Sequence, residues 1–149
     1  MKKIALITVN FGRAQDTLEL LKSAKKLDTT GFNFRIIVVD ATPDDWIGDH
    51  IKVKPLNVEL LQAGENKGFA GNYNVGMRYA TAWGADYVMI INNDTLIGDK
   101  LLIKKLIRIL EDYPEASVVS PKIYFAPGYE FFKDRYKKWE EGKVILYGG

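Results

Sequence analysis

The chain has 149 residues, a length typical of one domain with a substantial core. Its content of 47% hydrophobic and 27% charged residues excludes a disordered chain. The net charge of +2 gives no reason to expect a nucleic-acid partner, and the lack of cysteine excludes disulfides, thiolate metal sites and a cysteine nucleophile. No apolar run approaches the roughly 18 residues that a membrane-spanning helix needs.

The first part of the chain predicts a strand, a helix and a second strand. Residues 3–10 form an apolar run that ends in a polar turn, and residues 34–39 form another that stops at Asp40. Between them, Asp16 and Glu19 have the spacing of a capping box, which predicts the start of a helix. Apolar residues then recur at helical intervals at Leu18, Leu21, Ala24 and Leu27.

The middle of the chain predicts a loop, a short strand and a helix. Residues 41–55 contain prolines, aspartates and a glycine that break any periodicity, and we assign the only histidine, His50, to a solvated position in this loop. Residues 57–62 predict a third strand. Residues 69–83 predict a helix, because apolar residues recur on one face and Gly84 provides a C-terminal stop.

A fourth strand and another helix are expected next. Residues 87–91 are continuously apolar, which is typical of a central strand that is covered on both faces of a parallel sheet. A helix follows Gly98 and Asp99 and ends at Pro114, and residues 117–120 predict another strand. The expected buried stripe of this helix consists of Leu102, Leu106, Ile109 and Tyr113.

Residues 123–149, which we call the aromatic tail, are rich in aromatic and charged side chains. Residues 133–140 predict a short helix and residues 144–147 a last strand. Since that strand leads only into a turn, we expect the chain to be cut inside a larger domain. The aromatic tail is also a candidate surface for self-association.

Polar side chains stand where the predicted strands end. Asp40 follows the second strand, and Asn92, Asn93, Asp94 and Thr95 follow the fourth. In open α/β sheets, ligands bind beyond the carboxyl ends of the strands. A carboxylate, two amides and a hydroxyl suit a hard cation that also holds a phosphate. The alternative is a polar turn in which Asp94 or Thr95 caps the segment that follows.

The helix at residues 69–83 begins with an unfavourable composition. Gly71 and Gly76 each cost about 1 kcal/mol relative to alanine in a helix interior. Such a start suggests that a phosphate approaches the backbone amides, with Lys67 adding positive charge. The alternative is tight packing of the helix on the sheet. The glycine spacing matches neither a GxGxxG motif nor a P-loop.

Three stretches together resemble the nucleotide-binding half of family 2 glycosyltransferases of the GT-A fold, particularly their rhamnosyltransferase-like branch. They are TVNFGR after the first strand, ENKGFAGNYNVG at the glycine-rich helix and MIINNDT at the fourth strand. The resemblance covers residues 4–122. It implies an α/β, Rossmann-like fold of three layers, α/β/α, around a mostly parallel sheet. Residues 1–122 would be the nucleotide-diphospho-sugar-binding domain, and residues 123–149 would begin a truncated acceptor-side region.

The resemblance also implies site residues. Asp40 matches an acidic residue that contacts the nucleoside, and Asp94 matches the metal ligand of the family's D-x-D motif, holding Mn²⁺ or Mg²⁺. Asn92 replaces the first aspartate of that motif, and Asn72 stands where many relatives carry arginine. The implied nucleotide-binding residues are Thr8, Val9, Asn10, Arg13, Asp40, Asn66, Lys67, Gly68, Asn74, Asn92 and Asn93.

The implied function is metal-assisted, inverting transfer of a sugar from a UDP- or dTDP-linked donor to a saccharide or lipid-linked acceptor, in polysaccharide biosynthesis. We expect a cytoplasmic protein, at the cytoplasmic face of the membrane if the acceptor is a lipid. No residue qualifies as the catalytic base, since Asp134, Glu140 and Glu141 are assigned to solvated charges. We therefore expect donor binding with little or no transfer.

Two alternatives remain open at this point. One is a non-catalytic interaction module that forms homodimers through the aromatic tail. The other is a receiver- or flavodoxin-like domain, which also places aspartates at strand ends.

Overall fold

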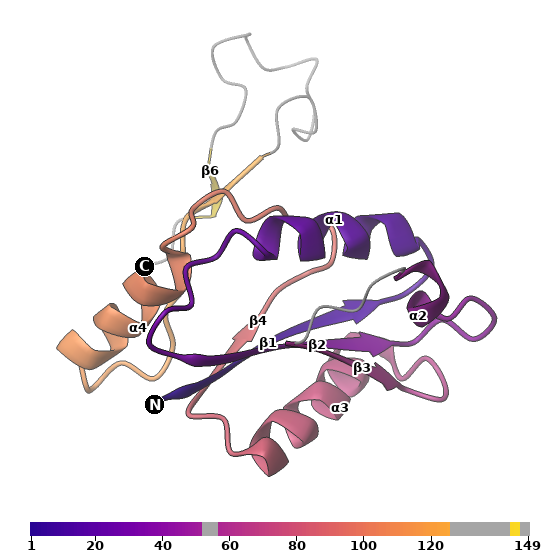
Figure 1. Cartoon of the computed structure of the whole chain (residues 1–149), viewed down its shortest axis with the longest axis horizontal. Helices are drawn as coiled ribbons and strands as arrows, with labels where there is room; N and C mark the ends of the chain where they lie inside the picture. Colours follow the sequence, from indigo (N-terminus) through magenta and orange to yellow (C-terminus); the bar gives the residue numbers. More distant parts are fainter. Residues whose placement is uncertain (52–56, 126–143, 147–149) are drawn as a thin grey trace, which may run out of the picture. The chain divides into compact units, whose positions relative to one another are not determined.

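The computed structural model describes residues 1–51, 57–125 and 144–146 (Figure 1). The chain divides into two compact units, Met1–Leu101 and Leu102–Gly149. The boundary between these units, after Leu101, differs from the functional boundary expected at residue 122. The functional boundary stays a prediction.

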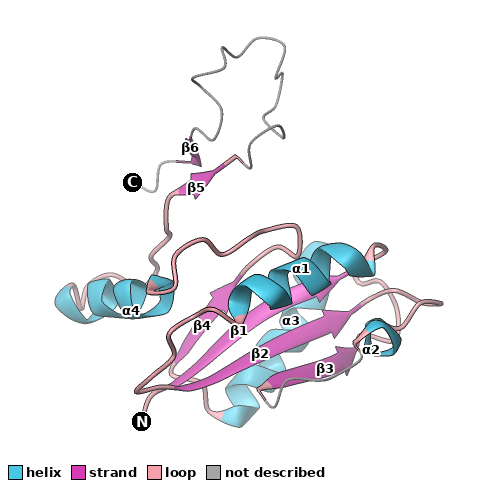
Figure 2. Cartoon of the chain, turned by 45° about the horizontal axis from the view of Figure 1, so that its top comes forward, coloured by secondary structure: helices cyan, strands magenta, loops and turns pink. Residues whose placement is uncertain are grey.

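The first unit is built on a four-stranded sheet in the order β3-β2-β1-β4, with every neighbouring pair parallel (Figure 2). The strands are β1 (Lys3–Asn10), β2 (Asn33–Asp40), β3 (Val58–Gln62) and β4 (Tyr87–Ile90). β1 and β2 pair over their full length, so that their last residues, Asn10 and Asp40, lie side by side. The predicted first, second and third strands are confirmed.

Helices cover both faces of this sheet. α1 (Ala14–Ala24) lies on one face and α3 (Gly68–Trp83) on the other, while the short α2 (Ile47–His50) lies near the carboxyl end of β2 (Figure 2). The predicted α/β fold of three layers around a parallel sheet is therefore confirmed. α3 also ends as predicted, because Gly84 adopts a left-handed φ of 79° and donates its N–H to the Ala80 carbonyl.

The core between α3 and the sheet comes from alternate residues of β1 and β2. Ile7 and Val39 are buried there with Tyr73 and Ala80 of α3. A Cβ on Gly76 would lie 2.5 Å from Ile7 Cγ2 and 3.1 Å from Val39 Cγ2. Gly76 therefore allows α3 to approach the sheet closely, as the packing alternative for this glycine-rich helix required.

The predicted capping box of the first helix is wrong. α1 begins at Ala14, after Arg13, and Arg13 makes no side-chain cap. Asp16 therefore lies inside the first turn, and Thr17 turns its hydroxyl inward to Asn10 instead of capping the helix. The buried face of the helix also differs from the expected stripe, since it consists of Ala14, Thr17, Leu20, Leu21 and Ala24.

The fourth strand is not central in the described sheet. β4 is an edge strand, because β1 occupies the interior position between β2 and β4. Val88 and Ile90 on β4 are exposed, while Tyr87 and Met89 are half-buried. The apolar run therefore correctly predicted a strand but not its position. α2 was also not predicted, since residues 41–55 were expected to be a loop.

The second unit contains α4 (Leu102–Asp112) and a two-stranded antiparallel pair, β5 (Ile123–Tyr124) with β6 (Val144–Leu146). Ile103 and Ile107 are the buried residues of α4, whereas Ile109 and Tyr113 are exposed, so the predicted stripe is shifted.

Two further predictions concern the end of the chain. Residues 117–120 form no strand, whereas β6 confirms the predicted last strand. The helix expected at residues 133–140, like most of the aromatic tail, lies outside the described residues. Among the helices that are described, none has the length and apolar character to cross a membrane.

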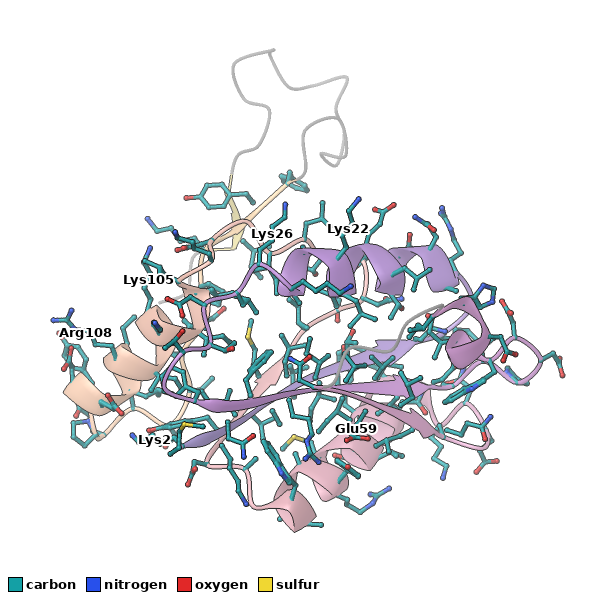
Figure 3. The ribbon with its side chains drawn as sticks, in the orientation of Figure 1. Lys2, Lys22, Lys26, Glu59, Lys105 and Arg108 are labelled. Carbon is teal, nitrogen blue, oxygen red and sulfur yellow. The ribbon has the colours of Figure 1, made fainter. Side chains whose placement is uncertain are left out.

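Charged side chains lie mainly on the outside of both units. Lys22 and Lys26 extend from α1 and the turn that follows it, and Lys105 and Arg108 extend from α4 (Figure 3). Lys22 and Lys26 are both exposed to solvent.

Candidate functional site

The carboxyl ends of the parallel strands meet at one edge of the sheet. Asn10 and Asp40 end β1 and β2, and Ile91, just beyond β4, donates its N–H to the Ile7 carbonyl of β1 at 3.0 Å. Residues 92–95 therefore follow directly from the same edge. This is the position at which open parallel sheets bind ligands.

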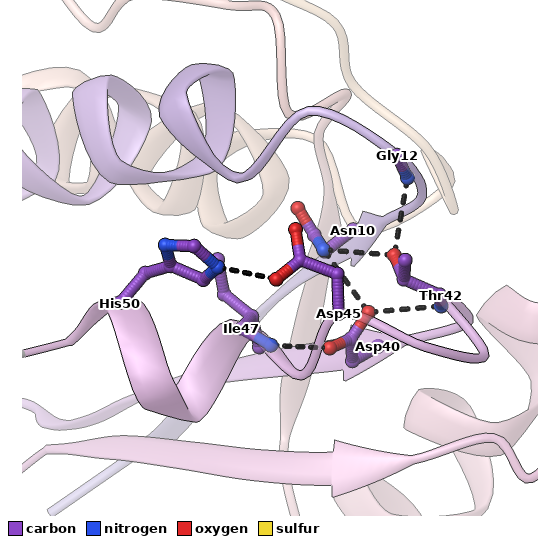
Figure 4. A network of polar contacts seen from close by, with 7 residues as sticks. All are labelled: Asn10, Gly12, Asp40, Thr42, Asp45, Ile47 and His50. Atoms are coloured by element: carbon purple, nitrogen blue, oxygen red, sulfur yellow. Dashed lines mark hydrogen bonds and ion pairs between the residues drawn. The ribbon is translucent and has the colours of Figure 1, made fainter.

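Asp40 is buried, and its carboxylate accepts hydrogen bonds from neighbouring segments of the chain (Figure 4). Its Oδ1 accepts hydrogen bonds from Asn10 Nδ2 and from the Thr42 N–H, both at 3.0 Å. Its Oδ2 accepts from the N–H of Ile47, the first residue of α2, at 2.6 Å. Both oxygens thus have partners within the chain, and the contact of Asp40 with a nucleoside stays a prediction.

Asn10 is fully buried and lies at the centre of a polar network. Besides Asp40, its Nδ2 contacts Thr42 Oγ1 at 3.2 Å, and its Oδ1 accepts from Thr17 Oγ1 at 2.7 Å. Thr17 Oγ1 in turn accepts from Asn93 Nδ2 at 3.1 Å. Sequence reasoning missed Thr17, because its partners Asn10 and Asn93 lie elsewhere in the sequence.

The predicted residues of β1 do not present their side chains to the surface. Thr8 and Asn10 are fully buried, and Thr8 Oγ1 has no hydrogen-bond partner among the described residues. Val9 is half-buried. Contacts of this strand end with a ligand would therefore involve the backbone.

Tyr73 of α3 supports the segment after β4. Its hydroxyl donates to the Ile91 carbonyl at 3.0 Å and lies 3.3 Å from Asn92 Oδ1. Burial, with a smaller contribution from the charge of Asp94, raises the pKa of Tyr73 to about 12. Tyr73 therefore stays a neutral hydrogen-bond donor at physiological pH.

Asn92 and Asp94 themselves are exposed. Their side chains can contact a ligand beyond the sheet edge without displacing the core.

The start of α3 is held by two asparagines. Asn66 Oδ1 accepts from the Gly68 N–H and from Asn72 Nδ2, each at 3.0 Å, and Asn72 Oδ1 accepts from the Lys67 N–H at 3.1 Å. Asn72 is buried, so it braces this turn instead of facing solvent. A Cβ on Gly71 would lie 2.6 Å from Lys67 Cβ. Gly71 and Gly76 thus both have packing reasons, and phosphate binding at this turn stays a prediction.

His50 belongs to an ion pair that sequence reasoning missed. Its Nε2 lies 2.6 Å from Asp45 Oδ1, and the hydrogen bond and charge of Asp45 raise the pKa of His50. The pair lines an open cavity of about 490 Å³ with Arg13 and Gln15. The sequence signal for this ion pair was the closeness of the histidine to acidic residues within residues 44–50.

Two predicted binding residues point to solvent. Arg13 is exposed and lies 3.9 Å from Asp16, and Asn74 is on the exposed face of α3. Neither joins the network around Asn10, so their contacts with a ligand stay predictions.

The residues beyond β4 offer few carboxylates to a metal ion. Within residues 1–51, 57–125 and 144–146, no group of three or more histidine, cysteine or acidic side chains is placed to hold a metal ion. The exposed Asp94 thus offers a single carboxylate. It suits a cation such as Mg²⁺, which is commonly bound through one or two carboxylates while water and substrate phosphates fill its other positions.

The fold and this polar edge define an α/β protein whose candidate ligand site lies beyond the ends of parallel strands. The model of glycosyl transferase family 2 matches residues 5–147, and the chain belongs to this family. A comparison with curated proteins found no match.

Solved structures share the fold. S. aureus TarS 1-349 is similar with a TM-score of 0.60 and 23% identity, over 85% of this chain and 41% of that chain. Its complex with UDP-GlcNAc is similar with a TM-score of 0.61 and 25% identity, over 76% of this chain and 32% of that chain.

The mannosyltransferase PcManGT from Pyrobaculum calidifontis, in complex with GDP-Man and Mn²⁺, has a TM-score of 0.64 and 20% identity, over 74% of this chain and 32% of that chain. The fold is thus of the GT-A type. The chain spans less than half the length of these proteins.

Proposed function

We propose that this chain is the donor-binding part of a glycosyltransferase that uses a nucleotide-diphosphate sugar, with UDP and dTDP as the expected nucleotides. The observation that carries the proposal is the exposed Asp94, which stands directly beyond β4 at the edge where β1 and β2 also end. Membership of glycosyl transferase family 2 supports it. So do the TarS complexes with UDP and UDP-GlcNAc and the PcManGT complex with GDP-Man and Mn²⁺.

The roles of the residues follow from their exposure and charge. Asp94 would hold Mn²⁺ or Mg²⁺, and such an ion would supply positive charge beside the diphosphate of the leaving group. Tyr73 orients the backbone that carries Asn92 and Asp94, through its hydrogen bond to the Ile91 carbonyl. Lys67, exposed at the start of α3, adds positive charge for the diphosphate.

The finer parts of the proposal rest on the resemblance. They are transfer of a hexose with inversion, a rhamnosyltransferase-like donor preference, and a saccharide or lipid-linked acceptor in polysaccharide biosynthesis. A cytoplasmic location, at the membrane face for a lipid acceptor, and homodimers through the aromatic tail belong with them. Because no candidate base was found, we propose that this chain alone transfers little or no sugar.

The receiver- or flavodoxin-like alternative has less support. The family match favours a glycosyltransferase over a receiver- or flavodoxin-like domain. In addition, both oxygens of Asp40 already accept hydrogen bonds within the chain, which disfavours Asp40 as a phosphate acceptor.

Calorimetric titration of UDP, dTDP and GDP, each with and without Mn²⁺, tests the proposal. We expect metal-dependent binding of one nucleotide, weakened at least about tenfold by Asp94→Ala, since contacts to charged groups contribute about 1.5–3 kcal/mol. Asp112→Ala is the control, because it removes a surface carboxylate of α4 that pairs with Arg108 at 3.4 Å. No binding of any nucleotide, or equal binding by the Asp94 and Asp112 variants, would refute the proposal.

A further inference from the structure

Thr17 on α1 connects two parts of the candidate site that are far apart in the sequence. Its hydroxyl donates to Asn10 Oδ1 at 2.7 Å and accepts from Asn93 Nδ2 at 3.1 Å. A threonine hydroxyl has one proton, and the side-chain nitrogen of asparagine only donates, so the direction of each bond is determined. Thr17 is fully buried, so no water replaces these partners.

On its other side, Asn10 extends this connection to β2. Its Nδ2 donates to Asp40 Oδ1, and Asp40 Oδ2 accepts from the Ile47 N–H at the start of α2 (Figure 4). A continuous series of hydrogen bonds therefore runs from α2 through Asp40, Asn10 and Thr17 to Asn93. It joins β1, β2, α1 and the segment after β4.

The two ends of this series lie at different parts of the proposed donor site. Asp40 stands at the end at which the nucleoside is expected. Asn93 is flanked by the exposed Asn92 and Asp94, where the metal and diphosphate are expected. Movement at either end alters hydrogen bonds that the other end shares, because the intervening Asp40, Asn10 and Thr17 side chains are buried.

We propose that Thr17 is a positioning residue that couples the nucleoside end of the donor site to its metal end, by holding Asn93 against the Asn10–Asp40 pair. The inference rests on the proposed function, since it concerns the same donor site. Thr17 contacts neither nucleotide nor metal itself. Its effect is transmitted through the orientation of Asn93 and the segment that carries Asp94.

Two substitutions separate this role from simple packing. Thr17→Val retains the shape of the side chain but lacks the hydroxyl, which leaves Asn10 Oδ1 and Asn93 Nδ2 without this partner. Thr17→Ser retains the hydroxyl and loses a methyl group. Asn93→Ala removes the last member of the series while leaving the Thr17–Asn10 bond, so it serves if Thr17→Val does not fold.

The measured quantity is the coupling factor, defined as the Kd for UDP without Mn²⁺ divided by the Kd with Mn²⁺. If another nucleotide binds more tightly, it replaces UDP. We expect Thr17→Val and Asn93→Ala to reduce the coupling factor of the wild-type chain at least about fivefold, and Thr17→Ser to keep it within about twofold. A packing role would lower thermal stability in the Val and Ser variants without changing this factor.

The outcomes are distinguishable. If the folded Thr17→Val chain keeps the wild-type coupling factor, the inference is overturned while the proposed function stands. A wild-type chain that binds no nucleotide overturns the proposed function and the inference with it. Loss of coupling in Thr17→Val with rescue by Thr17→Ser supports both.

Discussion

Replacing Gly76 with alanine should destabilise the protein, although alanine is the better helix former. Gly76 is buried in α3 against β1 and β2, and a Cβ there would lie 2.5 Å from Ile7 Cγ2 and 3.1 Å from Val39 Cγ2. Carbon atoms in good contact are about 3.5–4.0 Å apart. α3 or the strands would therefore have to shift by about 1 Å.

Two opposing effects determine the magnitude. Overpacking of a filled core costs about 1–3 kcal/mol. Replacing glycine with alanine inside a helix contributes about 1 kcal/mol of stability. The expected result for Gly76→Ala is a net loss of about 1 kcal/mol in the free energy of unfolding.

Urea unfolding followed by circular dichroism measures this loss as a lower midpoint at an unchanged slope. The exposed Arg78 on the same helix provides the control, since Arg78→Ala should be more stable than Arg78→Gly by about 1 kcal/mol. If Gly76→Ala instead stabilises the protein by that amount, the close approach of α3 to the sheet is refuted.

Two further predictions concern Tyr73 and His50. Tyr73→Phe should lower the free energy of unfolding by about 1 kcal/mol, because the Ile91 carbonyl loses its donor; an unchanged urea midpoint would argue against this hydrogen bond. NMR titration should give His50 a pKa above 6.5, and Asp45→Asn should lower it, whereas a pKa at or below 6.5 would contradict the ion pair. Since folding raises this pKa, the stabilisation by the pair is complete below pH 6.5 and disappears as the pH rises through the raised pKa.

Some patterns confined to one segment predicted that segment correctly. The apolar runs that stop at Asn10 and Asp40 predicted β1 and β2, because a buried strand of a parallel sheet must be apolar on both faces. Gly84 predicted the end of α3, because a left-handed residue there favours glycine.

Features that depend on distant partners were not predictable from such patterns. Thr17 was not predicted as a site residue, because its partner Asn93 is 76 residues away in the sequence. Similarly, an apolar strand such as β4 contains no signal for whether one neighbouring strand or two will pair with it. Glycines in a helix are also ambiguous, because both close packing and the approach of a ligand can require them. At Gly76, the close contacts that a Cβ would make with β1 and β2 favour packing.

The location of the donor site is the central claim, and mapping by NMR tests it most directly. Amide spectra of the full chain would be recorded during titration with UDP and the diamagnetic Mg²⁺, or with whichever nucleotide binds best. We predict the largest shifts at residues 10–12, 66–68 and 91–95. Shifts concentrated in residues 102–125, or none at saturating nucleotide, would contradict a donor site beyond the ends of β1 and β4.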